Sequence, residues 1–550
     1  MKLATISLML LLCAMNAGAR TEMGISLSPD ADAKITVGGC FDTLSLPGYA
    51  PVDVTINNNT GQPRQWLFQF SSPGYGMNIV NTMQSTFTVT VENNGTRTTS
   101  LLVPTSYSEE RRTPLGVRVT GYGVENSGQQ MIGGFSSSGK TPTPFVVISE
   151  SLGTALWSDL SKRLETDGKE LVGSTVNPDD LPDDWRGLSG VAGMWLTGDE
   201  LNHLSAPQRN ALQTWVHAGG WLMLCGAAEA PRDFRFPGFG QVRILSPKLD
   251  INETRVTIKE ELPAYSQVGH FPAPQRFSEV RPNVPLLFCL MGLFAVVVGP
   301  VNVFVFARQR RERLFWTTPV ISLGVSALLM AMIVMQDGAG GHGLRNAVVY
   351  LFPESRNEVL IQEQISRAGL LLGSAFQTRD PVCMQQLVIP TTGPAARGRA
   401  LQNTGSAYSG EWFTSRAAQA QRIVAVLPTR AEITLLNASD VRAKNAAPVI
   451  VSSFADTLDS LVYTDDQSRP WWATGIHTGQ KTTLQLMDKP TNGFRDGVSY
   501  LTSPSLRLLA KQPGYFRATS PEGRDYVATL NSIHWEDGEV TYIGPVTATP

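Results

Sequence analysis

The chain has 550 residues, of which 42% are hydrophobic and 17% are charged, and its formal net charge is −2. This length exceeds what one hydrophobic core supports, so several domains are expected. Without an excess of positive charge the chain lacks the footprint of a nucleic-acid-binding protein, and we expect no nucleic acid among its partners.

The N-terminus carries the pattern of a targeting segment. Lys2 precedes an apolar stretch at 6–15, and Ala17 and Ala19 supply the small residues that signal peptidases require. We therefore predict a signal peptide over 1–19. The alternative is a first membrane anchor, but the apolar stretch is shorter than the ~20 residues of a membrane-spanning helix. Whether the peptide is removed stays open.

Residues 20–140 show the alternation that is typical of β-strands. Apolar and polar residues alternate over 50–59 and 85–104, and the Asn94-Gly95 pair is a favoured hairpin turn. Several short alternating strands without a long helical pattern predict a β-sandwich of the immunoglobulin-like type.

Residues 141–250 change to an α/β pattern. Continuous apolar stretches at 145–149, 191–198 and 221–226 are typical of strands that are buried on both faces. Helical spacing lies between them, at 153–164 and 205–220, and Ser205 with Gln208 forms a capping box. This alternation predicts a layered domain with a parallel sheet.

Two stretches resemble a family. The stretch "LTGDELNHLSAPQRNALQTWVHAGGWLMLCGAAE" (196–229) resembles class I glutamine-amidotransferase-like domains of bacterial envelope proteins. The stretch "GPVNVFVFARQRRERLFWTTPVISLG" (299–324) is similar to the basic-loop segment of large bacterial membrane proteins that carry such a domain outside the cell. The resemblance covers roughly 140–335 and implies an amidotransferase-like fold for the α/β domain.

The residues depart from that family at the nucleophile. Family members place a catalytic Cys on a tight Gly-x-Cys-x-Gly turn, whereas Met223 and Leu224 precede Cys225 here. Cys225 with His270 as its base is one candidate catalytic pair, but we favour a buried, structural Cys225. Asp199 and Glu200 follow a strand at the edge where α/β sheets bind ligands. They are candidates for acid/base chemistry, and the alternative is a solvated loop that leads into a helix.

Two uncharged apolar stretches, 284–307 and 314–335, flank a dense group of arginines. At ~1.5 Å per residue a helix over 284–307 is about 36 Å long, enough to cross a ~30 Å hydrocarbon layer. Arginine at the bilayer centre costs about 2.5–3.5 kcal/mol, so the chain is expected to cross twice and to leave the loop 308–313 in the cytoplasm. The topology-determining residues of that loop are Arg308, Arg310, Arg311 and Arg313. The arginines are expected to anchor the loop electrostatically at the membrane surface, and the alternative is a specific binding site for anionic lipid.

The expected segments place both large flanks outside the cytoplasm. Residues 251–283 form a linker before the hairpin, and 336–550 form a second extracytoplasmic, β-rich domain. The spans contain no Asp, Glu, Lys or His, which disfavours an ion or proton path. No cysteine or histidine spacing indicates a metal site, and we expect no cofactor.

These patterns predict a protein of the bacterial inner membrane with a binding or scaffolding role and no catalysis. The expected partners are the lipid bilayer and other envelope proteins. The competing hypothesis is an exported hydrolase or amidase that uses Cys225 or the Asp199/Glu200 edge.

Overall fold

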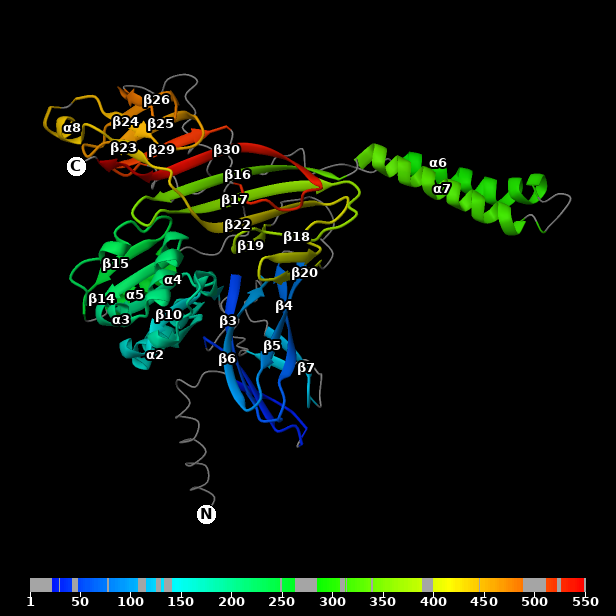
Figure 1. Ribbon diagram of the computed structural model, residues 1–550, viewed down its shortest axis with the longest axis horizontal. Coiled ribbons are helices and arrows are strands. Elements are labelled where there is room, and N and C mark those ends of the chain that lie inside the picture. Colours follow the sequence, from blue (N-terminus) through cyan, green and yellow to red (C-terminus); the bar gives the residue numbers. More distant parts are fainter. Residues whose placement is uncertain are drawn as a thin grey trace, which may run out of the picture.

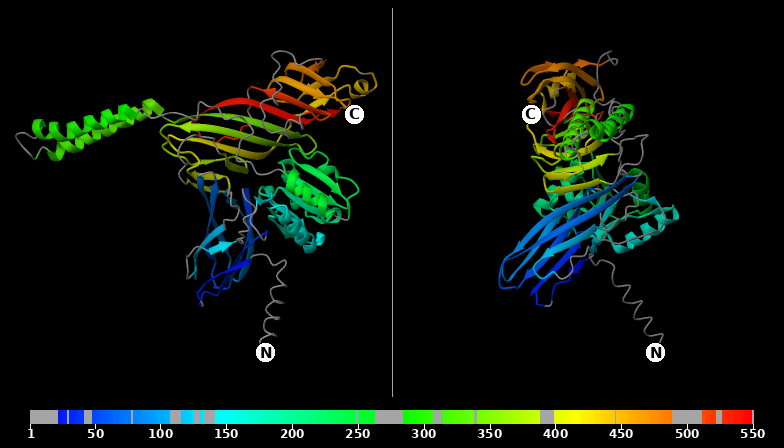
Figure 2. Two further views of the ribbon diagram at one scale, coloured as in Figure 1. Left: turned by 180° about the vertical axis from the view of Figure 1, so that it is seen from behind. Right: turned by 90° about the vertical axis from the view of Figure 1, so that its right-hand side faces the viewer.

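The protein is strand-rich and multi-domain, with several sheets and separate hydrophobic cores. The computed structural model describes residues 22–28, 30–41, 48–76, 79–106, 115–124, 130–132, 141–247, 250–262, 284–306, 312, 314–337, 340–387, 399–444, 446–487, 511–521 and 526–548. An N-terminal pair of sheets and an α/β unit lie side by side beneath the long strands of a C-terminal sheet (Figures 1 and 2).

The first N-terminal sheet has four antiparallel strands in the order β1-β2-β3-β6. Its strands are β1 Glu22–Ile25, β2 Ala33–Gly39, β3 Gly48–Asn58 and β6 Gly95–Thr105. Alternate residues such as Val52, Val54 and Ile56 point into a buried core, as the period of two predicts.

The second N-terminal sheet has seven strands in the order β18-β21-β20-β5-β4-β7-β8. Its strands come from both flanks of the chain. They are β4 Arg64–Gly76, β5 Ile79–Val91, β7 Leu115–Gly121, β8 Gln130–Ile132, β18 Phe376–Gln377, β20 Arg399–Thr404 and β21 Ala407–Gly410. Strand β20 pairs parallel with β5, from Arg399 opposite Asn81 to Gln402 opposite Gln84. The expected boundary between an N-terminal and a C-terminal domain is therefore crossed by one continuous sheet.

The two N-terminal sheets face each other across one core, in which Trp66, Phe68 and Val103 are fully buried. The turn at Asn94-Gly95 exists, and Asn94 has a φ of 52°. It does not close a hairpin, however, because β5 pairs with β4 while β6 pairs with β3 of the other sheet. The hairpin prediction was wrong because a turn signal fixes the chain reversal but not the partner strand.

The α/β unit contains a five-stranded parallel sheet in the order β12-β10-β13-β14-β15. Its strands are β10 Val146–Ser149, β12 Gly173–Val176, β13 Gly193–Thr197, β14 Trp221–Cys225 and β15 Gln241–Leu245, and its helices include α2 Thr154–Thr166, α3 Gly198–His203 and α4 Ala206–His217. Successive strand residues enter two different cores, with Met194 and Leu196 in one and Trp195 in the other. This explains why the strands are apolar without alternation.

Local signals in this unit are confirmed in detail. Ser205 caps α4 and forms the predicted capping box with Gln208. The unit also extends beyond residue 250, because α5 Ile251–Val256 and the π-helical turn Thr257–Glu261 follow. Ile258 and Leu262 are buried in the core that contains Trp195, so the expected boundary at 250 moves to residue 262. Residues 263–283 lie outside the described part.

The C-terminal part is built around a nine-stranded sheet in the order β19-β22-β17-β16-β30-β29-β25-β26-β28. Its strands are β16 Gly341–Phe352, β17 Asn357–Ala368, β19 Val382–Leu387, β22 Ala418–Pro428, β25 Leu458–Thr464, β26 Pro470–Ile476, β28 Gln485–Leu486, β29 Tyr515–Ser520 and β30 Ile533–Pro545. A smaller sheet follows the order β27-β24-β23-β31, with β23 Ile433–Leu435, β24 Val449–Ser452, β27 Lys481–Thr483, β31 Thr547–Ala548 and the nearby helix α8 Ala438–Lys444.

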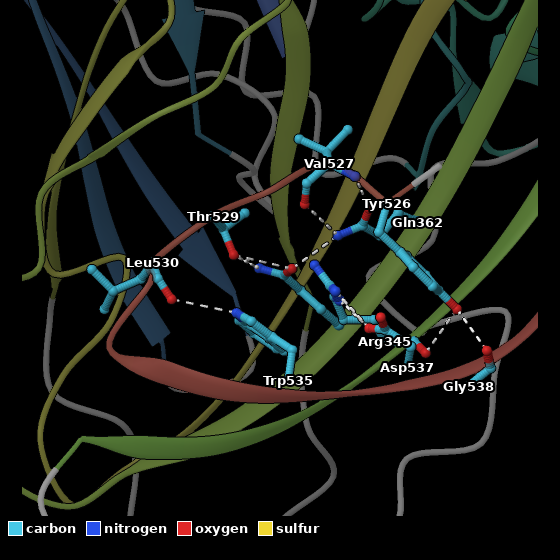
Figure 3. A network of polar contacts seen from close by, with 10 residues as sticks. Arg345, Gln362, Tyr526, Val527, Thr529, Leu530, Trp535, Asp537 and Gly538 are labelled. Carbon is cyan, nitrogen blue, oxygen red and sulfur yellow. Dashed lines mark hydrogen bonds and ion pairs between the residues drawn. The ribbon is translucent and has the colours of Figure 1, made fainter. Parts of the chain in front are cut away.

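A polar network holds residues 526–530 against β16 and β17 (Figure 3). The Arg345 side chain lies over the rings of Tyr526 and Trp535, at 4.7 and 5.7 Å from the centroids, and its Nε donates to Asp537 at 2.7 Å. Buried Gln362 accepts from Val527 N at 2.7 Å and donates to Val527 O at 3.1 Å. These bonds satisfy backbone groups that no strand partner reaches.

The apolar region projects away from the sheets as two adjacent helical segments (Figures 1 and 2). The first is α6 Val284–Val296, continued by a π-helical stretch Val297–Phe306 that contains Pro300, and the second is α7 Leu314–Asp337. Proline lacks the N–H that an α-helix needs, which fits the change of hydrogen-bond pattern around it. In the described residues one helix, over Leu314–Ala331, has the length and composition of a membrane span, and Met291–Val305 is a shorter apolar helix.

Candidate functional site

A polar cleft lies on the outer face of the seven-stranded sheet, where strands from the two flanks meet. Its volume is about 680 Å³, within the range of ~300–1,000 Å³ that small-molecule sites occupy. It is lined by Gln69, Phe70, Ser71, Gln84, Ser85, Thr86, Arg118, Ala375, Phe376, Gln377, Gln402, Thr404, Ala407, Tyr408 and Ser409.

The sheet register aligns one row of polar side chains across four neighbouring strands. Ser71 of β4 pairs with Gln84 of β5, Gln84 with Gln402 of β20, and Gln402 with Ser409 of β21. Paired residues on neighbouring strands point to the same face. The row therefore forms a continuous polar surface of hydroxyl and carboxamide groups.

The two ends of the cleft differ. At the end formed by β18 and β21, the rings of Phe376 and Tyr408 stack with centroids 5.0 Å apart on the core-facing side of the sheet, because the register pairs Phe376 with Tyr408 and Tyr408 with buried Asn403. The groups that this end presents to the cleft are therefore polar, as at Gln377 and Ser409. At the β7 end lies Arg118, which is opposite Gln69 in the sheet register and is the single charged residue of the lining. The cleft thus combines neutral hydrogen-bonding groups along its length with one cation at the β7 end.

A buried junction behind the cleft joins three parts of the chain. Tyr49 of β3 donates from its hydroxyl to Val382 O at 3.2 Å and accepts from Asn403 Nδ2 at 2.7 Å. Its backbone N donates to Ser189 Oγ in the α/β unit at 3.0 Å. Burial raises the pKa of Tyr49 to about 12. The phenol therefore stays protonated as a structural donor.

Close approach at this junction needs a glycine. Gly48 has a φ of 142°, and a Cβ there would lie 2.3 Å from Ser189 Oγ. Any other residue would push the α/β unit away from β3.

A second interface connects the α/β unit to the C-terminal sheet. The His217 ring, at the end of α4, stacks on Phe352 of β16 with centroids 3.6 Å apart. Phe239 packs edge-on against Tyr350, and Phe236 against Tyr515. Burial lowers the pKa of His217 to about 4, so the imidazole is neutral near pH 7 and behaves as a packing group.

Cys225 is buried at the end of β14 with 3% of its surface exposed, among residues that include Trp195 and Met223. Burial raises the pKa of its thiol to about 12, and the Glu200 carboxylate acts in the same direction. The thiolate is the nucleophilic form of cysteine, and it is scarce at neutral pH with such a pKa. Cys225 therefore has the surroundings of a structural cysteine.

Asp199 and Glu200 lie in the first turn of α3. The Glu200 carboxylate accepts from Thr197 N at 2.7 Å, and Glu200 N donates to Thr197 Oγ1 at 3.1 Å. This reciprocal pair is a capping box, which satisfies two helix-end donors. The Asp199 carbonyl oxygen lies 2.7 Å from Nδ1 of His203. Both acids are separate from the cleft, whose lining comes from 69–118 and 375–409.

Other predicted site residues lie outside the described part of the chain. They are His270 and the four arginines Arg308, Arg310, Arg311 and Arg313, and the predicted signal peptide 1–19 also lies there. In the ranges that the structure describes, no three or more His, Cys, Asp or Glu side chains are grouped to hold a metal ion.

The sequence prediction missed the cleft entirely. Gln84 and Gln402 each occupy the polar position of an alternating strand, which normally indicates a solvated face. The signal that they share a surface is the pairing of β5 with β20, and this pairing is visible only in the fold.

Comparisons with known proteins give little further information. No protein-family model matches the chain, and no curated protein matches it. One similar solved structure is Bacteroides uniformis beta-glucuronidase 2 covalently bound to cyclophellitol-6-carboxylate aziridine, at 10% identity and a TM-score of 0.13. Another is Bacteroides uniformis beta-glucuronidase, at 9% identity and the same TM-score. Each match covers 39% of this chain and 24% of the other. A TM-score of 0.13 is too low to show a shared fold.

Proposed function

We propose that this chain is a bacterial inner-membrane protein that binds or assembles envelope components outside the cytoplasm. A hairpin of two membrane-spanning helices, 284–307 and 314–335, would anchor it. An immunoglobulin-like sandwich and an amidotransferase-like α/β unit would precede the hairpin, and the β-rich part would follow it.

The pairing of β5 with β20 is the observation that carries this proposal. Both strands belong to one sheet and must fold in one compartment. The chain between them therefore crosses a membrane an even number of times or not at all. A single span over 314–331 would separate the two strands, whereas a hairpin keeps them together.

The surfaces of the helical segments favour insertion in lipid. Phe304, Trp316 and Leu323 are 71%, 79% and 72% exposed. Apolar side chains in such number are costly to hydrate, at about 25 cal/mol per Å², and mark a surface that contacts lipid or another protein.

Binding is favoured over catalysis by the surroundings of the candidate residues. Cys225 is buried with a raised pKa, and Glu200 caps a helix, so the hydrolase hypothesis gains no support from either. The contacts of Tyr49 and His217 join the N-terminal sheets, the α/β unit and the C-terminal sheet, so the surfaces of these three parts are held in fixed positions relative to one another. Such an arrangement raises the effective concentration of bound partners.

Reporter fusions test the topology. Alkaline phosphatase, which is active only outside the cytoplasm, is fused after Pro550, and a matched control fusion ends at Glu312, between the two predicted spans. We expect activity from the first fusion and none from the second. Inactive phosphatase after Pro550, together with fluorescence of a cytoplasmic reporter at the same position, would refute the layout.

Cross-linking in intact cells tests the binding role. The full chain, purified after cross-linking, is expected to carry other envelope proteins that are lost when the Tyr49 junction is broken by Gly48→Val. Recovery of the chain alone from both forms would argue against a scaffold.

A further inference from the structure

The hydrogen-bonding groups of the cleft select the chemical class of its ligand. Its Gln side chains each present a carbonyl acceptor and an amide donor, and its Ser and Thr hydroxyls do both. Sugar hydroxyls also donate and accept, so they match such a surface without a change in charge. A strongly charged ligand would meet only Arg118 as a charged contact in the lining.

The orientation of two carboxamides is set by the protein itself. Ser409 Oγ donates to Gln402 Oε1 at 2.8 Å, and Gln402 Nε2 donates to Gln84 Oε1 at 3.5 Å. In the described structure this chain of bonds ends at Gln84, whose Nε2 group makes no bond to protein. Donors held in place before binding lose less entropy when a ligand arrives.

A peptide fits the cleft less well. Extended peptides commonly bind by adding a strand to a free sheet edge. The strands beneath the polar row, β4, β5 and β20, are each paired on both sides. Recognition here must come from side chains on the sheet face.

From these observations we infer that the cleft binds a short neutral oligosaccharide. Gln84, Gln402 and Ser409 hydrogen-bond its hydroxyl groups. This inference names the ligand class of the binding role proposed above and rests on it.

Calorimetric titration of the full chain tests the inference. The protein is held in a detergent without a sugar headgroup, such as lauryldimethylamine oxide, and titrated with chitotetraose and maltotetraose. Tetra-alanine serves as the peptide control. We expect at least one saccharide to bind with a Kd below 1 mM, and no heat from the peptide.

Matched variants locate the site. Gln84 and Gln402 are exposed on their strands, so a change at either should leave the fold intact. The variants Gln84→Leu and Gln402→Leu are each expected to weaken saccharide binding at least ten-fold, with an unchanged circular dichroism spectrum. Gln65→Leu is the control, because Gln65 is an exposed residue of β4 that does not line the cleft. It should leave the affinity unchanged.

Three results would overturn the inference: no saccharide binding by the folded chain, equal affinity in the Gln84 and Gln402 variants, or preferential binding of tetra-alanine. Because the titration uses purified protein, its outcome is independent of the reporter fusions. A failure of the topology and a failure of the ligand class can therefore be told apart.

Discussion

Gln402 lies directly opposite Gln84 in one sheet, although 318 positions separate the two residues in the chain. The helical segments 284–306 and 314–337 lie between them in sequence. The N-terminal sandwich is therefore completed by a strand from the far flank, and the two flanks are expected to lose structure together.

Truncation of Leu401 tests this coupling. Leu401 of β20 is 2% exposed and belongs to the same core as Met83 of β5. Leu401→Ala is expected to lower the free energy of unfolding by about 2–5 kcal/mol, since it leaves a cavity. Amide hydrogen exchange should accelerate in β5 as well as in β20. Thr404→Ala, an exposed position of the same strand, should change neither, and unaltered exchange in β5 of the Leu401 variant would show that the flanks are independent.

His217 predicts acid sensitivity of the docked α/β unit. Its pKa falls from an ordinary value of 6.5 to about 4 on burial. Below pH 6.5 the unfolded state binds a proton that the folded state excludes. Stability is therefore full above that pH and falls as the pH drops toward 4, by on the order of 3 kcal/mol. Urea unfolding at pH 7 and pH 4.5 measures the loss.

Variants assign that pH dependence. His217→Gln should reduce the difference in unfolding free energy between the two pH values, because the new side chain does not titrate. His203→Gln changes an exposed residue in the same unit. This variant should show the same difference in unfolding free energy between the two pH values as the unchanged protein. The same slope in both variants would trace the acid sensitivity to other groups.

Thiol labelling separates the described cysteines by burial. Cys40, Cys225 and Cys383 are buried, whereas Cys289 is exposed on α6. Burial raises the pKa of Cys225 to about 12 and that of Cys383 to about 11. In detergent at pH 7 a small maleimide is therefore expected to label the three buried thiols only after denaturation, and Cys289, on a segment that the detergent covers, reports whether 284–307 is embedded. Fast labelling of Cys225 in a Cys289→Ser variant would revive a nucleophilic role.

Asn302 predicts a specific contact between the two helical segments. It is 1% exposed, donates from Nδ2 to Thr318 Oγ1 at 2.9 Å and accepts from Thr317 Oγ1 at 2.6 Å. Polar contacts between helices in lipid contribute about 0.6–2 kcal/mol. A double-mutant cycle of Asn302→Ala and Thr318→Val should give a coupling energy of that size in detergent unfolding. A cycle with Ser326→Ala, at an exposed position of α7, should give none.

The sequence predicted the α/β unit well because its signals are local. The cap at Ser205 and the helix that follows it depend on neighbours within one or two turns. Strand partners depend on distant residues, and periodicity does not encode them, so the pairing of β5 with β20 and the change of sheet after Asn94 were both missed. The cleft was missed for the same reason, since each of its polar residues resembles ordinary surface until the fold brings it to the others.

The two expected spans illustrate another limit. An uncharged apolar stretch predicts a helix that suits a membrane, but it does not predict the hydrogen-bond pattern of that helix. Here the first helix changes from α to π near Pro300. Only the helix over Leu314–Ala331 has the length of a membrane span among the described residues. Both crossings thus remain predictions that the reporter fusions test.

The parallel pairing of β5 has a consequence for biosynthesis. With 318 positions between Gln84 and its partner, and synthesis at roughly 5–20 residues per second, the strand waits roughly 15–60 s before that partner is made. During that time an unpaired strand edge faces its surroundings, where it can join another nascent chain. A growing copy of this protein therefore stays open to such pairing until β20, Arg399–Thr404, has been synthesised.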